Sequence, residues 1–193
     1  MNAYQLYLAV HIGAATLWVG AACMQALLGV RVVRASDPVR MLAFARDGHW
    51  TGLHVYLPTN LLVLASGLLL VYSGSWSLTT LWLDLGFAGF VISIATGAAA
   101  LKPGWDKAAE LSEQDGAVLH QLVRRLVFVT HVDLAVLTGV MYLMIVKPAL
   151  REPLSLAVGA AAVVVVLLLS RRVLAAKPLL SADMQTAAAT PRA

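Results

Sequence analysis

Long stretches without a charged side chain constrain this chain more than any other feature of its sequence. Residues 3–30 contain no Asp, Glu, Lys or Arg and no proline, and a second uncharged stretch covers residues 48–83. A helix that crosses the hydrocarbon core of a bilayer needs about 20 predominantly apolar residues. Stretches of this length therefore predict membrane-spanning helices.

The composition indicates the same class of protein. Hydrophobic residues make up 60% of the 193 residues and charged residues 12%, whereas soluble domains have about 45–50% and about 25%. We therefore expect an all-α integral membrane helix bundle that forms a single transmembrane domain over residues 1–177. The tail, residues 178–193, is rich in Ala, Ser and Thr and is expected to be disordered.

Turn-forming and charged residues divide the apolar stretches into five spans. Residues 73–77 (SGSWS) interrupt the second stretch, and Lys102-Pro103-Gly104 is expected to end the third span. Ser36-Asp37-Pro38 supplies an N-cap and a first-turn proline for a short interfacial helix. The expected architecture is a four-helix core with a fifth C-terminal span, the helices covering residues 3–30, 51–72, 80–101, 118–146 and 154–170.

The basic residues are distributed unequally between the two ends of the predicted bundle. Short loops rich in Lys and Arg stay in the cytoplasm. The side that holds the first loop, the third loop and the tail carries Arg31, Arg34, Arg40, Arg46, Lys102, Lys107, Arg124, Arg125, Arg171, Arg172, Lys177 and Arg192. The other side carries only Lys147 and Arg151. This predicts a multi-pass protein of the bacterial inner membrane, with the N-terminus outside and the C-terminus in the cytoplasm.

Five ionisable side chains are expected at membrane depth, away from the ends of the spans: His11, His54, Asp84, His131 and Asp133. Such residues are costly inside a bilayer and tend to be functional. Their depths, taken from about 1.5 Å of rise per residue, place His11 with Asp84 in the outer half. The same estimate places His54 with His131 in the inner half.

Histidines on facing helices are the usual means by which a helix bundle holds haem b. The candidate ligands of a haem or metal ion are therefore His11, His54 and His131. Trp18 follows His11 by two helical turns on the same face and is a candidate wall of the cofactor pocket. The alternative interpretation is that each histidine only joins neighbouring helices by a hydrogen bond.

Asp84 and the methionines of the fourth span suggest a different metal site. Asp84 would accept a hydrogen bond from the second ring nitrogen of His11, an arrangement common around metals. Met141 and Met144, together with His11, provide ligands that suit copper. Asp133 points about 200° away from His131 on the same helix, so the two cannot both face one small ligand.

The first span contains His11, Trp18 and Gly20 in the pattern H-x6-W-x-G. This pattern resembles the opening signature of a superfamily of small bacterial membrane proteins. The superfamily includes the copper-resistance protein CopD, the HemJ-type protoporphyrinogen oxidases and an uncharacterised predicted-integral-membrane family, to which this chain is most similar. The fourth span also resembles those relatives, in Arg124-Arg125 at its start and Val146-Lys147-Pro148 at its end.

The resemblance covers the first four spans and implies haem binding through His11. HemJ-type proteins also have a lysine within the third span, where this chain has Asp84 and no lysine before Lys102. This difference argues against protoporphyrinogen oxidation.

The sequence leads to three hypotheses about function. The first is a haem b-binding redox or electron-transfer protein of the inner membrane. The second is a copper-linked transport or resistance protein, and the third is a cofactor-free accessory subunit. The expected partners are the lipid bilayer, a membrane redox partner and further copies of the chain in a homo-oligomer. Nucleic acid is excluded because the basic residues form no clustered patch, and no motif assigns a catalytic residue.

Overall fold

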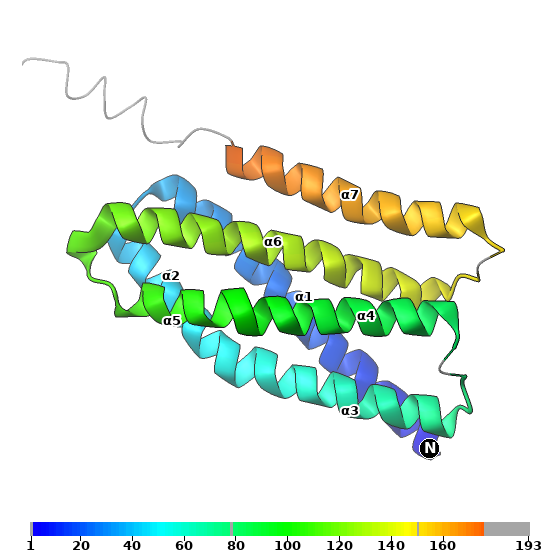
Figure 1. Ribbon diagram of the computed structural model, residues 1–193. Coiled ribbons are helices and arrows are strands. Elements are labelled where there is room, and N and C mark those ends of the chain that lie inside the picture. The colour runs from blue at the N-terminus through cyan, green and yellow to red at the C-terminus, as the bar shows by residue number, and fades with distance from the viewer. Residues whose placement is uncertain (1, 78, 150, 176–193) are drawn as a thin grey trace, which may run out of the picture.

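The computed structural model describes residues 2–77, 79–149 and 151–175, and its regular structure is helical (Figure 1). The first span is α1 (Ala3–Ala35). The fourth span is α6 (Gly116–Val146), which follows the 3₁₀ turn η3 (Glu113–Asp115), and the fifth span is α7 (Pro153–Ala175). The second and third spans are each built from three helical pieces: α2 (Pro38–Thr51), η1 (Gly52–Tyr56) and α3 (Leu57–Ser73), then α4 (Leu81–Thr96), η2 (Gly97–Leu101) and α5 (Lys102–Glu110). The predicted tail lies outside the described residues.

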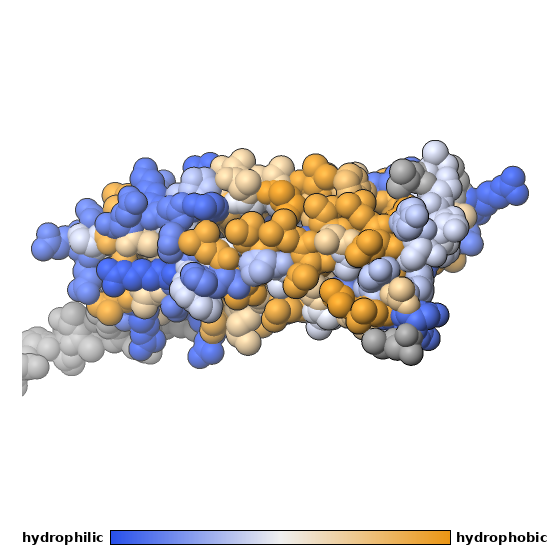
Figure 2. Space-filling view, turned by 90° about the horizontal axis from the view of Figure 1, so that it is seen from below, coloured by the Kyte–Doolittle hydropathy of each residue, from blue (hydrophilic) through white to orange (hydrophobic). Residues whose placement is uncertain are grey.

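The described part of the chain has five helices that are long and apolar enough to cross a membrane. Side chains along the middle of the molecule are mainly hydrophobic, and hydrophilic side chains gather at both ends (Figure 2). This distribution matches the apolar core and polar faces of a bilayer. The prediction of an all-α, multi-pass membrane bundle is confirmed.

Local capping explains where the first two helices meet. The N-terminus of α1 is closed by Asn2, whose side chain accepts from the Gln5 backbone N–H at 2.8 Å, and its C-terminus by Ser36 in a left-handed conformation. Asp37 then caps α2 by accepting from the Val39 backbone N–H at 3.0 Å, with Pro38 at the first position. The predicted helix start is confirmed, but α2 continues into the second span and is not a separate interfacial helix.

Two prolines within the second and third spans, Pro58 and Pro103, are accommodated by π-helical segments. The Leu57 N–H bonds to the Gly52 carbonyl in η1, and the Lys102 N–H bonds to the Gly97 carbonyl in η2. Each segment directly precedes the turn that holds Pro58 or Pro103. The wider turn moves away the carbonyl that a proline ring would strike in a regular α-helix. The expectation that Lys102-Pro103-Gly104 ends the third span is therefore wrong, because the helix runs on to Glu110.

The helices form an incomplete ring. The α1 helix packs against α3 and α6, α4 packs against α6, and α2 packs against α5. By contrast, α3 and α4 form no extensive interface with each other, and their ribbons diverge away from the α2–α5 contact (Figure 1). The α7 helix packs along α6, where the Tyr142 hydroxyl donates to the Ser155 carbonyl at 2.6 Å.

The two ends of the bundle differ in their charged contacts. We call one end the basic end; it holds the C-terminus of α1, all of α2 and α5 and the start of α6. There the carboxylate of Asp106 contacts His49 at 2.7 Å and Lys102 at 2.6 Å. At the opposite end, the Lys147 ammonium lies 5.0 Å from the ring centre of Trp76 and 5.2 Å from that of Trp82. These contacts hold the α3–α4 turn against the end of α6.

Two hydrophobic clusters fill the interior. The end cluster lies near the basic end and contains Val30, Val33, Met41, Leu42, Phe44, Ala45, Trp105, Ala108, Leu119, Val123, Leu126 and Val127. The middle cluster contains Ala14, Trp18, Ala22, Val63 and Leu137. Polar side chains are buried between the two clusters, and His11 lies beyond the middle cluster toward the opposite end.

Candidate functional site

One face of α1 points into the bundle and carries His11. Ala14, Trp18, Ala22 and Gln25 follow it at intervals of three or four residues, and these four are buried. Residues at this spacing lie on one side of an α-helix. His11 therefore belongs to the core-facing stripe of α1, and its partial exposure shows that the bundle is less tightly closed at this level.

The imidazole of His11 is oriented by α3. Its Nδ1 lies 3.0 Å from the Val63 carbonyl and 3.1 Å from the Ser66 hydroxyl oxygen. A carbonyl oxygen only accepts hydrogen bonds, so Nδ1 carries the proton and Nε2 keeps its lone pair. The Ser66 hydroxyl donates to the Leu62 carbonyl, so its oxygen is free to accept from His11. A neutral imidazole with Nδ1–H on a carbonyl is the state in which histidine binds metals through Nε2.

Glycine at position 67 allows the His11 ring to approach α3. A Cβ atom at Gly67 would lie 3.2 Å from Cε1 of His11, closer than ordinary van der Waals contact. Trp18 lies one level deeper, with 5% of its surface exposed and its ring edge-on to Phe90 at 5.7 Å between ring centres. This arrangement is consistent with the prediction that Trp18 lies on the same face of the first helix as His11.

His54 faces away from the interior. It lies in η1, its side chain is exposed, and its ring stacks on Trp50 with 4.6 Å between ring centres. Its Nδ1 is 2.9 Å from the Trp50 carbonyl, so Nδ1 donates a hydrogen bond to that carbonyl. The stacked pair lies on the outer surface of the second span, where tryptophan anchors a helix at the membrane boundary.

His131 is buried, but at a different level from His11. Its Nδ1 is 2.7 Å from the Val127 carbonyl and 8% of its surface is exposed. Gly29 of α1 meets Val127 across the helix interface. With about 1.5 Å of rise per residue, His11 and His131 are roughly 20 Å apart along the bundle. The three histidines therefore occupy three separate places, and the predicted inner pair of His54 and His131 does not share one face.

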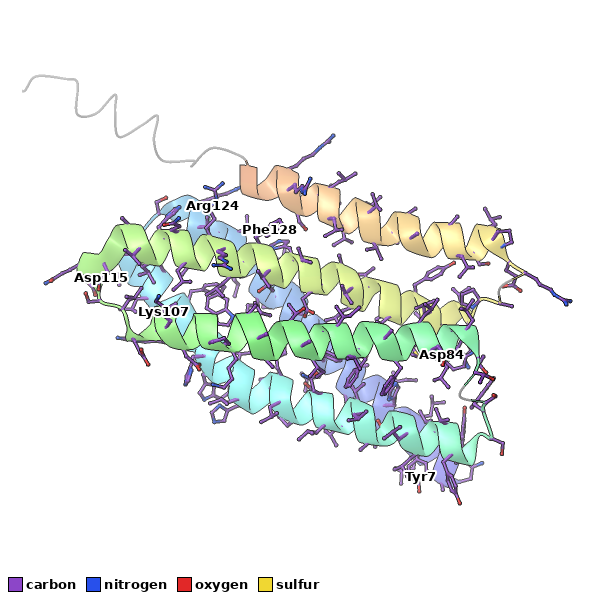
Figure 3. All side chains as sticks on the ribbon, viewed as in Figure 1. Tyr7, Asp84, Lys107, Asp115, Arg124 and Phe128 are labelled. Carbon is purple, nitrogen blue, oxygen red and sulfur yellow. The ribbon has the colours of Figure 1, made fainter. Side chains whose placement is uncertain are left out.

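Asp84 is not the partner of His11 in this structure. It lies exposed in the first turn of α4, at the opposite end from Lys107 and Arg124 (Figure 3). Val63 and Ser66 of α3 occupy the orienting role that the sequence suggested for Asp84. Met144 packs beside Gly86 of α4, and among the described residues no three His, Cys, Asp or Glu side chains are grouped so that they could hold a metal ion.

A layer of polar side chains separates the two hydrophobic clusters and includes three residues that the sequence did not single out. The Tyr56 hydroxyl donates to Gln25 Oε1 at 2.7 Å, and the Ser93 hydroxyl lies close to the Asp133 carboxyl. Asp133 also lies within electrostatic range of Tyr56. This polar layer, formed by Gln25, Tyr56, Ser93 and Asp133, joins α1, η1, α4 and α6.

A sequence signal for the polar layer exists, but it is weak. Gln25 falls on the core-facing stripe of α1, fourteen positions after His11, which predicts burial. A neutral amide in an apolar span attracts less notice than a histidine. Tyr56 and Ser93 have no distinguishing spacing, so only the packing of their helices brings them to the same level.

The arrangement of apolar spans and buried polar residues defines a multi-pass membrane protein with a helix-bundle core. Residues 5–148 match the family described as predicted integral membrane protein (DUF2269), and the chain belongs to this family. The match covers the first four spans and stops before α7. No curated protein matches the chain, and no solved structure does.

Proposed function

We propose that this chain is a haem b-binding redox protein of the bacterial inner membrane, with His11 as the axial ligand. The observation that carries the proposal is the hydrogen bond from His11 Nδ1 to the Val63 carbonyl. It leaves the Nε2 lone pair available on the core-facing side of α1. Haem iron, when bound, would supply one-electron transfer.

The surroundings of His11 fit a flat apolar group better than those of the other two histidines. His54 stacks on Trp50 outside the bundle, and His131 lies within the most buried helix. Beside His11, α3 and α4 form no extensive interface, so a macrocycle inserted between them would not have to separate packed helices. Trp18 and Phe90 provide an aromatic floor.

The structure favours a single protein histidine on the iron. Two axial imidazoles must approach the metal from opposite faces at the same depth, and His131 is roughly 20 Å from His11 along the bundle. In a redox role, His11 would therefore be the one of the three histidines that holds the haem, and Met144 of α6, which packs beside Gly86 of α4, would be a candidate for a second, weaker ligand.

An absorption spectrum of gently solubilised protein, combined with metal analysis, tests this proposal. A haem protein shows a Soret band and iron close to one equivalent per chain. Copper with no Soret band would support the second hypothesis, in which His11, Asp84, Met141 and Met144 handle copper. Neither metal, in protein expressed with ample haem and copper, would leave the cofactor-free accessory subunit and would overturn the haem proposal.

The proposed membrane topology has its own test. Lys102 and Asp106 lie at the basic end and Lys147 lies at the opposite end beside the α3–α4 turn. If the basic end is cytoplasmic, reporter domains fused after Ser75 and after Lys107 should report outside and inside respectively. The reverse pattern would place His11 near the cytoplasm and contradict the proposed orientation.

A further inference from the structure

Two atoms of the polar layer have no hydrogen-bond partner among the residues that the structure describes: Gln25 Nε2 and Asp133 Oδ1. The side chains are well buried, with 9% of Gln25 and 8% of Asp133 exposed. Leaving such a group unpaired is unfavourable, because the group loses its hydrogen bonds to water on burial. Nε2 is a donor and Oδ1 an acceptor, so one type of small molecule, water, can satisfy both.

We propose that the polar layer is a hydrated binding site, in which water molecules bind Gln25 Nε2 and Asp133 Oδ1 and connect with the solution at the basic end. Buried water in proteins usually makes about three hydrogen bonds to polar groups that lack other partners. Tyr56 and Ser93 add hydroxyl groups to the same layer. The site is separate from His11 and does not depend on haem.

The η1 segment provides the route by which water reaches this layer. Trp50 and His54 are exposed and mark the membrane boundary on the second span, and Tyr56 lies only about 3 Å farther along the helix axis. No residue of η1 is buried. On α1, Gln25 is about 9 Å from Arg31 along the axis. Water entering beside η1 therefore has a short way to the two unpartnered atoms.

The single cysteine of the sequence, Cys23, is a built-in reporter of hydration. It is partly buried on α1 and lies within electrostatic range of Tyr56. Thiol reagents react with the thiolate, which is disfavoured in apolar surroundings and favoured where water reaches the thiol. The experiment measures the rate at which a charged, membrane-impermeant methanethiosulfonate labels Cys23 in the full chain, reconstituted in lipid vesicles.

A neighbouring lipid-facing position supplies the matched control. Met24 is 58% exposed on the outside of the bundle, so a Cys23→Ser/Met24→Cys variant places a thiol at nearly the same depth in contact with lipid. Cys23 should react about tenfold faster than this control thiol, because the reagent and the thiolate both require water. Labelling should occur from the side that carries the basic end.

Two substitutions separate hydration from a general loosening of the bundle. Asp133→Leu removes a polar anchor and should slow the labelling of Cys23 to the rate of the Met24→Cys control, whereas Asp133→Asn should keep it fast. If Asp133→Leu does not fold, Gln25→Leu serves the same purpose. Equal rates for Cys23 and the control, or an unchanged rate in the leucine variant, would overturn the proposal without bearing on haem binding.

Discussion

The region around His11 and the polar layer differ in how their polar groups are satisfied. His11 has two partners on α3, Val63 and Ser66, and only one nitrogen remains for a ligand. In the polar layer, Gln25 and Asp133 are more deeply buried, and each keeps one atom without a partner among the described residues. The first arrangement is suited to holding one ligand rigidly, and the second is suited to exchangeable small molecules. Two polar sites in one bundle can therefore serve different chemistry.

Removal of the imidazole of His11 should have the largest effect on the difference between the two regions. If the chain binds haem as proposed, His11→Ala should lower haem affinity by more than about 100-fold, because even changes around a metal ligand cost about 10–100-fold. The measurement is the Soret absorbance per chain at equal yield of folded protein. His54→Ala is the control and should keep the haem, since its ring lies outside the bundle. Loss in the His54 variant with retention in the His11 variant would reverse our assignment.

Crowding of the same imidazole should give a smaller effect. Gly67→Ala places a Cβ atom 3.2 Å from His11 Cε1, so the ring must shift by a few tenths of an ångström, and haem affinity should fall about tenfold. Haem titration of the purified apoprotein measures the change. Gly13→Ala has nothing within 4 Å and should bind haem normally. Equal haem affinities in the two variants would show that the position of the His11 ring against Gly67 is unimportant for haem binding.

A substitution in the polar layer should affect stability rather than haem binding. Tyr56→Phe removes the hydroxyl that donates to Gln25 and should lower the free energy of unfolding by about 1 kcal/mol. Unfolding in mixed micelles with increasing denaturing detergent measures this change. Tyr72→Phe, at a side chain that is 87% exposed, should leave stability unchanged. If Tyr56→Phe instead lowered the haem affinity without changing the free energy of unfolding, the two sites would be coupled.

The contact of Lys147 with Trp76 of the α3–α4 turn and Trp82 of α4 should contribute least. Lys147→Asn keeps a residue that tolerates the left-handed backbone at this position (φ 51°) but removes the cation. Stability should fall by about 0.5 kcal/mol, the value of an exposed cation–π contact, and Lys147→Arg should preserve it. The same unfolding assay applies. If Lys147→Asn lost more stability than Tyr56→Phe, the contacts at this end would stabilise the bundle more than the polar layer does.

Sequence reasoning was most successful where the physical signal is local. Long apolar stretches predict all five spans, and Asp37-Pro38 predicts the start of α2, because hydrophobicity and capping depend on neighbouring residues. The helix that continues through Pro103 was not predicted, since a proline normally ends or kinks a helix. Only the π-helical turn before it explains the continuation.

The candidate site could be predicted only in part. A histidine within an apolar span is conspicuous, so His11 and Trp18 were correctly expected on one face of the first helix. The partners of His11 could not be found in the same way, because Val63 supplies a backbone carbonyl and Ser66 a common hydroxyl. The grouping of His54 with His131 considered depth alone. Depth does not say which side of a helix a residue occupies.

The two π-helical segments also set the rotational phase of the helices that contain them. Each gains about one residue relative to a regular helix, which turns everything beyond it by about 100°. Gly52 and Gly97 begin these segments at the same distance before Pro58 and Pro103. The turn lets α2 and α5 face each other while their continuations, α3 and α4, face α1 and α6. Deleting one residue from either segment would leave a straight helix unable to satisfy both sets of neighbours.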